Sequence, residues 1–386
     1  MNKIGLINIQ RCDSHGAVLL AYALEKVLEE LGYEPTNIDY KYAGRIKEKN
    51  IVKRVYLKIL IVLKKKLHIS YANYNFFGKN IKNEYDIQSK RFSDFRNAYL
   101  NLTKEITNPC DDVLREFDGF VVGSDVVWKP EIVSCEDKNI YFLKSVPDNT
   151  VKVAYAASIG TDNTQILNNV SEYYENAFDN FDYLSIREKS MIDFVRKYTT
   201  KSVESVIDPV FLLKQEMYME IEKNALGDFS ERPYIYVYIL GNNTTALKEA
   251  NQLAKKENCS ILIDLNENFD NANLLTTNVQ SAISAGPLEF LYNIRNAKYV
   301  ITDSFHATCF SLINNVPFTV FDRGAVSVRM QDLLKRFDIY DRHYEGKSLS
   351  IDSLPWERIN EQIKDERKQG IRFLEEAFHE GFTKSK

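Results

Sequence analysis

Residues 3–40, KIGLINIQRCDSHGAVLLAYALEKVLEELGYEPTNIDY, read as a strand, a helix and a second strand in succession. Residues 4–9 form an apolar run of the length of a buried strand. Residues 17–31 carry apolar side chains at helical spacing until Gly32, which ends the helix. Residues 37–40 resume an extended pattern, so the order predicts a β-α-β unit, from which parallel sheets are built.

The same alternation continues along the rest of the chain. A second series of strands and helices begins after the polar residues 227–233. The further strands that we expect are residues 119–122, 151–157, 183–186, 234–240, 260–265, 300–302 and 317–321, and the helices of the second series are 244–256, 288–296 and 306–314. The pattern predicts an α/β fold with two Rossmann-like domains facing a central cleft.

The length of the chain also favours two domains. Single cores stop growing at roughly 250–300 residues, and this chain has 386. We expect residues 1–230 to form the first domain, residues 231–350 the second, and the charged, helical residues 351–386 to pack at the domain junction. Because parallel sheets bind ligands at the carboxyl ends of their strands, functional residues are expected between the two sheets.

The composition argues against several classes of protein. A formal net charge of −4 provides no general attraction for nucleic acid. The five cysteines are far apart and form no C-x-x-C pair, which argues against disulfides and thiolate metal sites and favours a reducing cytoplasm. The five histidines form no H-x-x-x-H pair, so we expect no metal. No signal peptide and no apolar run of about 20 residues is evident, so we expect a cytoplasmic protein.

Residues 45–66 form a basic segment, with nine Lys or Arg residues against the single acid Glu48. Apolar residues are interleaved with these cations, which is typical of an amphipathic helix. Two interpretations stay open: peripheral contact with an anionic membrane or a lipid diphosphate, and a solvated helix whose apolar stripe packs on the sheet.

The densest cluster of polar residues is TDSFHATCF, residues 302–310, directly after an expected strand and at the start of a helix. Unpaired N–H groups and the helix dipole at such a start favour an anion, to which Ser304 and Thr308 could donate. His306 titrates near neutrality and could deliver a proton. The alternative is that Asp303 and Ser304 cap the helix and His306 is a hydrogen-bonded packing residue.

Two arginines are candidate ligands for an anion. Arg187 follows the expected strand 183–186 and would point a forked cation into the cleft. Arg329 is a similar but weaker candidate. The alternative for Arg187 is a surface ion pair with Glu188 or an aspartate.

Two further loops follow expected strands. Residues 123–128 combine a glycine turn with Ser124, the carboxylate of Asp125 and the indole of Trp128, on which a sugar could stack. The alternative is a capped turn with Trp128 in the core. Ser14, His15 and Gly16 could approach a ligand between the first strand and its helix, although this loop lacks the G-x-G-x-x-G pattern of a dinucleotide fold.

Several motifs, taken in order, resemble the polysaccharide pyruvyl transferase family over nearly the whole chain. They are Gly16-Ala17-Val18-Leu19 with Ala21-Tyr22-Ala23-Leu24, Gly123-Ser124-Asp125 with Trp128, Tyr155-Ala156-Ala157-Ser158 with Gly160, residues 185–189, Asp208-Pro209, Pro287 with Glu289-Phe290, residues 302–310, and Arg329 with Leu333-Leu334. The chain departs from the family at Ser14-His15, where an asparagine and an aromatic residue are usual, and at Ala307, where glycine is frequent. It also has Ser304 where some relatives carry an arginine, so the anion site is expected either to differ from theirs or to depend on Arg187.

The resemblance implies a fold similar to the GT-B glycosyltransferases, with the acceptor on the first domain and the donor on the second. It implies phosphoenolpyruvate as co-substrate with no further cofactor, and a sugar or lipid-linked glycan of a capsular or exopolysaccharide as acceptor, at the inner face of the membrane. It further implies catalytic roles for His306, Asp125 and Arg187, donor binding by Ser304, Thr308, Arg187 and Arg329, and acceptor binding by Ser14, His15, Gly16, Ser124, Asp125 and Trp128.

Two other classes of function are compatible with the same residues. A nucleotide-sugar glycosyltransferase would share the two-sheet architecture and use the same helix start for a diphosphate. A non-catalytic glycan-binding or phosphate-binding module would bind donor or acceptor without releasing phosphate.

Overall fold

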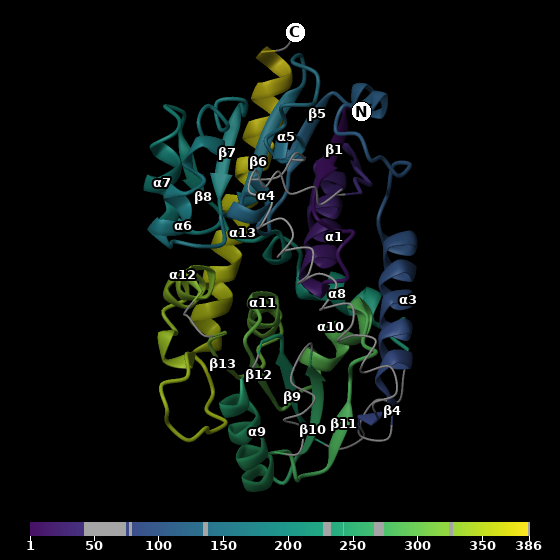
Figure 1. Ribbon diagram of the computed structural model, residues 1–386, viewed down its shortest axis with the longest axis vertical. Coiled ribbons are helices and arrows are strands. Elements are labelled where there is room, and N and C mark those ends of the chain that lie inside the picture. Colours follow the sequence, from purple (N-terminus) through teal and green to yellow (C-terminus); the bar gives the residue numbers. More distant parts are fainter. Residues whose placement is uncertain are drawn as a thin grey trace, which may run out of the picture.

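The computed structural model describes residues 1–41, 75–76, 79–133, 138–226, 233–241, 243–265, 274–323 and 327–384. The basic segment 45–66 and the helix expected there lie outside the described residues. The chain forms two α/β units stacked end to end, with the C-terminal helix running along the first of them (Figure 1).

The first unit is built on a six-stranded, fully parallel sheet in the order β2-β1-β5-β6-β7-β8. Every residue of β5 and β6 is buried, as expected of a parallel sheet covered by helices on both faces. Its strands are β1 (Lys3–Ile7), β2 (Glu34–Asn37), β5 (Gly119–Val122), β6 (Val151–Ala157), β7 (Tyr183–Ile186) and β8 (Val203–Ser205). Its helices include α1 (His15–Glu30), α4 (Pro130–Val133), α5 (Lys138–Tyr141), α6 (Thr164–Asn168) and α7 (Ile192–Arg196).

The second unit is built on a five-stranded parallel sheet in the order β11-β10-β9-β12-β13. The strands are β9 (Tyr234–Ile239), β10 (Ser260–Leu265), β11 (Val279–Ser281), β12 (Tyr299–Thr302) and β13 (Phe318–Val320). The helices are α9 (Thr244–Glu257), α10 (Pro287–Arg295), α11 (Phe305–Ile313) and α12 (Val328–Arg336). The predicted class, two parallel-sheet α/β domains, is confirmed.

Elements from the first 230 residues also pack on the second unit. Helix α3 (Ile81–Tyr99) follows the small antiparallel pair β3 (Asn75–Phe76) and β4 (Lys79–Asn80), and its Ile81 lies in the hydrophobic core of the second sheet. Helix α8 (Gln215–Glu222) packs against α10. One large hydrophobic core contains residues of both units. The boundary near residue 230 stays a prediction, because residues 227–232 lie outside the described residues.

The C-terminal helix α13 (Trp356–Lys384) packs on β6 of the first sheet and contacts α11 of the second unit (Figure 1). Two glycines allow this close approach. A Cβ at position 370 would lie 2.3 Å from the hydroxyl of Tyr155, and one at position 381 would lie 2.5 Å from Val151. The helix is therefore an integral part of the first unit and not an appendage.

A buried carboxyl group in α1 links the end of β2 to the segment that follows α3. The side chain of Glu25, 1% exposed, accepts hydrogen bonds from the side chain of Asn37 and from the backbone N–H of Asn101 at 3.0 Å. Burial raises the pKa of Glu25 to about 7, although the N–H of Asn101 and the ammonium of Lys26 counteract part of the rise. The folded protein therefore holds this proton more tightly than the unfolded chain does.

We expect Glu25→Gln to change how stability depends on pH. A carboxyl group whose pKa is raised in the folded state contributes stability below its unfolded pKa, and this contribution is lost as the pH rises through the folded value. Between pH 4.5 and pH 7 the free energy of unfolding of the wild-type protein falls by about 3 kcal/mol, at 1.36 kcal/mol per pH unit. Urea unfolding at pH 5 and pH 8 should show this loss in the wild type and in the control Glu30→Gln, at an exposed position of the same helix, but not in Glu25→Gln. The same loss in Glu25→Gln would assign it to another group.

Candidate functional site

The candidate site lies where the carboxyl ends of the two sheets meet. Arg187 directly follows β7, the loop of Ser124 and Asp125 follows β5, and α11 follows β12. The guanidinium carbon of Arg187 lies 4.2 Å from the centre of the Phe305 ring in α11. Residues of both units are therefore in direct contact at this junction.

A buried ion pair forms the centre of the site. Arg187 donates from Nη1 to Oδ2 of Asp208 at 2.7 Å and from Nε to Oε1 of Glu188 at 3.0 Å. The hydroxyl of Ser124 donates to the same Asp208 oxygen at 2.8 Å. None of these four residues is more than 5% exposed. The pair anticipated for Arg187 thus exists, but inside the protein and with two carboxylates.

Both members of this pair stay charged. Burial alone would lower the pKa of Arg187, but the carboxylates of Glu188 and Asp208 outweigh it and keep this pKa above its ordinary value. Burial alone would raise the pKa of Asp208, but the imidazole of His306 and the guanidinium of Arg187 hold it well below its usual range. The site therefore keeps a fixed cation and a fixed anion at neutral pH.

His306 lies in the first turn of α11, with Ser304 as the N-cap residue. Its Nε2 is 3.7 Å from Oδ2 of Asp208, which is longer than a hydrogen bond. Its ring rests against the backbone of Gly16 in α1, and a Cβ there would lie 1.9 Å from Nδ1 of His306. Glycine at position 16 is therefore required for the observed place of the imidazole.

A second arginine lies on the other side of the site. Nη1 of Arg329 in α12 is 3.8 Å from Oδ1 of Asp125. Burial and the neighbouring charge of Arg187 lower the pKa of Arg329. Asp125 has a φ of 71°, in the left-handed region that an aspartate tolerates better than most residues. Strained backbone of this kind occurs frequently at ligand-binding positions.

Three buried nitrogen atoms at this junction have no hydrogen-bond partner among the described residues. They are Nη2 of Arg187, Nε2 of His306 and Nε of Arg329. An unsatisfied buried donor is costly, by about 1–3 kcal/mol for a neutral group and more for a charged one. The oxygens of an anion are suitable partners for arginine N–H groups, which makes this a candidate anion-binding site, and Oε2 of Glu188 is unpartnered there as well.

Asp208 received no role in the sequence analysis beyond its place in a family motif. In the structure it is fully buried and binds the side chains of Ser124 and Arg187. The signal in the sequence is a carboxylate between the last strand of the first series and a proline. Nothing local indicates its partners, which lie 84 and 21 positions away.

The prediction that the indole of Trp128 offers a stacking surface to a sugar is wrong. The indole is 0% exposed, lies parallel to Phe142 at 5.8 Å, and meets the edges of Phe178 and Phe181. Its Nε1 donates to the carbonyl of Tyr141 at 2.9 Å. Because core side chains cover the ring, it offers no face to a sugar, and the alternative of a core tryptophan is the correct one.

Three other expected contacts also have internal partners. Thr308 is 0% exposed, and its hydroxyl donates a hydrogen bond to the carbonyl of Ser304 at 3.0 Å. This hydroxyl therefore does not face the donor substrate. Ser124 is likewise fully buried and bonded to Asp208. His15 is 3% exposed, stacks on Phe290 at 4.4 Å and has its Nε2 3.8 Å from Asp264. These side chains bind other residues of the junction and do not face an acceptor sugar. Ser14, by contrast, is exposed at the start of α1.

The described part of the chain contains neither a metal-binding cluster nor a membrane-spanning helix. Across these residues, no group of three or more His, Cys, Asp and Glu side chains is arranged to hold a metal ion. No helix within them is both long enough and apolar enough to cross a membrane.

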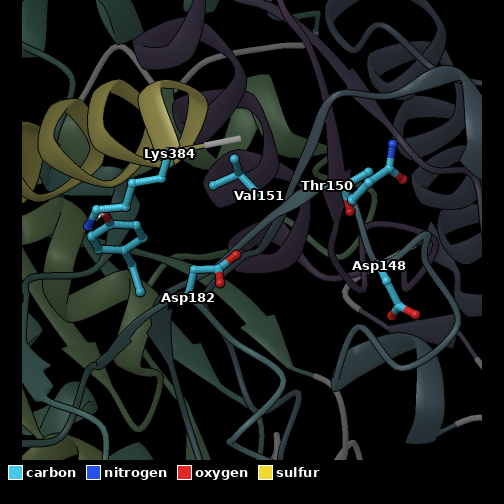
Figure 2. A pocket seen from close by; sticks show the side chains of 8 residues that line it. Asp148, Thr150, Val151, Asp182 and Lys384 are labelled. Carbon is cyan, nitrogen blue, oxygen red and sulfur yellow. Dashed lines mark hydrogen bonds between the residues drawn. The ribbon is translucent and has the colours of Figure 1, made fainter. Parts of the chain in front are cut away.

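A surface cavity lies at the opposite edge of the first sheet, at the amino ends of β6 and β7 (Figure 2). It has a volume of about 420 Å³, and its lining includes Asp148, Asp182 and Lys384. Asp182 accepts a hydrogen bond from the backbone N–H of Lys152, which is a structural role. The cavity shares no residue with the candidate site.

Comparisons with known proteins identify the family and the fold. The family model described as polysaccharide pyruvyl transferase matches residues 15–324. No curated protein matches the chain. The chain is similar to the crystal structure of UDP-GlcNAc 2-epimerase from Neisseria meningitidis bound to UDP-GlcNAc, with 12% identity, 100% of both chains covered and a TM-score of 0.50. It also matches the ADP-heptose lipopolysaccharide heptosyltransferase II of E. coli, with 11% identity, 95% of this chain and 99% of that chain covered, and a TM-score of 0.41. At this identity the first likeness shows the fold alone, and the predicted GT-B-like class is confirmed.

We expect Trp128→Ala to destabilise the protein by about 3–5 kcal/mol, because it removes a large side chain from a packed aromatic cluster. The other tryptophan, Trp356, is only partly buried, so Trp356→Ala is the matched control and should cost clearly less. Chemical unfolding of the two variants measures the difference. Equal unfolding midpoints for wild type and Trp128→Ala would contradict the core assignment.

Proposed function

This chain belongs to the polysaccharide pyruvyl transferase family, and from that premise we propose that it transfers the pyruvyl group of phosphoenolpyruvate to two hydroxyls of a sugar, forming a cyclic ketal. The observation that supports this most is the set of three unpartnered, buried nitrogens on Arg187, His306 and Arg329. Phosphoenolpyruvate carries a carboxylate and a phosphate on the same carbon, so it has several oxygens to supply to these nitrogens.

Donor binding is assigned to the two arginines and the start of α11. Arg187 would use its free Nη2 and Arg329 its free Nε for the phosphate and carboxylate oxygens. The first turn of α11, capped by Ser304, adds the positive end of the helix dipole. The carboxylates of Asp208 and Glu188 hold the guanidinium of Arg187 in place and leave its buried Nη2 without a partner.

His306 is assigned the proton transfer. As imidazolium it would donate a proton to the methylene carbon, leaving a cationic carbon that bears the methyl group, the carboxylate and the phosphate ester. A sugar hydroxyl then bonds to this carbon and transfers its proton to the carboxylate of Asp125, and proton exchange with solvent afterwards returns Asp125 and His306 to their starting states. A second hydroxyl forms the second carbon–oxygen bond as the bond to the phosphate oxygen breaks, its proton leaving with inorganic phosphate.

The acceptor is assigned to the first sheet. In the strand order β2-β1-β5-β6-β7-β8, the chain leaves β1 towards one edge of the sheet and leaves β5 towards the other edge. Open sheets bind ligands at the point between two such strands. The loops that meet there carry Ser14 and Asp125, and Asp125 would orient or deprotonate the sugar hydroxyl. A lipid-linked glycan of a capsular or exopolysaccharide, used at the cytoplasmic face of a membrane, is part of the proposal.

We expect His306→Ala to bind phosphoenolpyruvate but to release phosphate at least about 10²-fold more slowly in the presence of acceptor, because a general acid contributes that much or more. His379→Ala, at an exposed histidine on α13, is the matched control and should keep the wild-type rate. Phosphate release with a panel of candidate glycans, followed by mass spectrometry of the glycans, measures both steps. Undiminished turnover by His306→Ala would remove its proposed role, and wild-type binding without phosphate release would favour a non-catalytic binding module.

Asp303 weighs against a nucleotide-sugar donor. In the second sheet the connections diverge between β9 and β12, and there the Asp303 carboxylate accepts hydrogen bonds from the backbone N–H groups of Leu240 and Gly241, both at 2.8 Å. These are N–H groups of the kind that hold a diphosphate. Because an internal carboxylate already occupies them, these two N–H groups are not available to a diphosphate.

We therefore expect calorimetry to detect binding of phosphoenolpyruvate but not of UDP-GlcNAc to the wild-type protein. Arg329→Met should weaken phosphoenolpyruvate binding by about 1.5–3 kcal/mol, the range for a hydrogen bond to a charged group. Saturable binding of UDP-GlcNAc, with none of phosphoenolpyruvate, would instead favour a glycosyltransferase.

A further inference from the structure

Helix α12 attaches the second unit to the first through one of its faces. Arg329, Asp332 and Arg336 are spaced i, i+3 and i+7, so their side chains lie along the same side of the helix. Arg329 contacts Asp125, as described above. Asp332 accepts hydrogen bonds from the backbone N–H and the hydroxyl of Ser190, at 3.1 and 2.8 Å. The helix thus holds the segment that carries Arg187.

Arg336, at the last turn of α12, reaches the backbone of Arg187 itself. Its Nη2 donates to the carbonyl oxygen of Arg187 at 3.3 Å and to the hydroxyl of Ser205 at 2.6 Å. The hydroxyl of Ser205 in turn donates to the same Arg187 carbonyl at 3.4 Å. Two hydrogen-bond donors, Arg336 and Ser205, therefore converge on the backbone carbonyl of Arg187.

Arg336 is itself held by the C-terminal helix. Its Nη1 donates to Oε2 of Glu366 at 2.8 Å, and its carbonyl accepts a hydrogen bond from the side chain of Gln362. Glu366 and Gln362 are four positions apart on α13 and so share a face. The side chains of Arg336 and Glu366 are 14% and 17% exposed, so solvent screens this pair far less than a surface pair.

We propose that Arg336, anchored by Glu366, is a positioning residue for the anion-binding guanidinium of Arg187. The side chain of Arg336 donates to the Arg187 carbonyl, to the hydroxyl of Ser205 and to Glu366 on α13, and it has no hydrogen bond to the three residues that carry the unpartnered nitrogens other than this bond to the Arg187 carbonyl. Arg336 would affect a ligand only by setting the position of the Arg187 backbone. A displacement of a binding group by about 1 Å can cost 10²-fold in rate. This inference rests on the proposed function only for the identity of the anion.

The experiment compares Arg336→Met with the double variant Arg336→Met/Glu366→Gln. The single variant leaves the half-buried Glu366 without its cation, which destabilises the protein, whereas the double variant removes both charges and should recover much of the stability. Neither variant can donate to the Arg187 carbonyl. We expect both to raise the KM for phosphoenolpyruvate by about tenfold to a hundredfold, with a smaller change in kcat and an unchanged KM for the acceptor.

The control variant is Glu376→Gln, which breaks an exposed ion pair with Arg372 on the same helix and should leave all three constants unchanged. If the double variant regained both wild-type stability and wild-type affinity for phosphoenolpyruvate, Arg336 would have a purely structural role and the positioning proposal would be wrong.

Amide hydrogen exchange of residues 187–190 is the second measurement, and it does not depend on the donor. Both Arg336 variants should exchange faster there than wild type and Glu376→Gln. If wild type fails to bind phosphoenolpyruvate while exchange still accelerates, the proposed function fails and the positioning role stands. Unchanged exchange in both variants overturns the positioning role whatever the donor is.

Discussion

The buried ion pair between Arg187 and Asp208 is the constraint on which the rest of the junction depends. Breaking such a pair leaves an uncompensated charge inside the protein, at a cost of about 3–5 kcal/mol. The pair is satisfied only because the ends of three strands meet: Ser124 follows β5, Arg187 follows β7 and Asp208 follows β8. The parallel register of the first sheet therefore fixes where the charge lies.

This fixed charge organises the second unit as well. Phe305 covers the guanidinium, His306 approaches the carboxylate of Asp208, and Gly16 leaves room for the imidazole ring. The face of α12 then ties the same strand end to the C-terminal helix through Arg336. Residues of two sheets and two helices thus converge on one polar centre, while a shared hydrophobic core holds the units together. This combination suits a site that binds a compact anion between two domains.

Much of the fold was predictable because its signals are local. The apolar runs predicted as strands at 119–122, 151–157 and 183–186 coincide with β5, β6 and β7, since a strand buried on both faces of a parallel sheet is apolar throughout. The strand β11 (Val279–Ser281) was not predicted, because a short, partly exposed edge strand carries no such run. The packing of α3 and α8 on the second unit was also missed, because an amphipathic helix does not specify its partner.

For the candidate site, the sequence by itself determined which chemical groups stand at the carboxyl ends of the strands: an arginine at 187, a histidine at 306 and an aspartate at 125. It determined this because strand ends and helix starts are encoded by neighbouring residues. Only the tertiary structure decided that Asp208 is the partner of Arg187, that the indole of Trp128 lies in the core, and that His15 packs against Phe290. Those outcomes depend on contacts between residues far apart in the chain, whose energies appear only once both sheets have formed and excluded water from the junction.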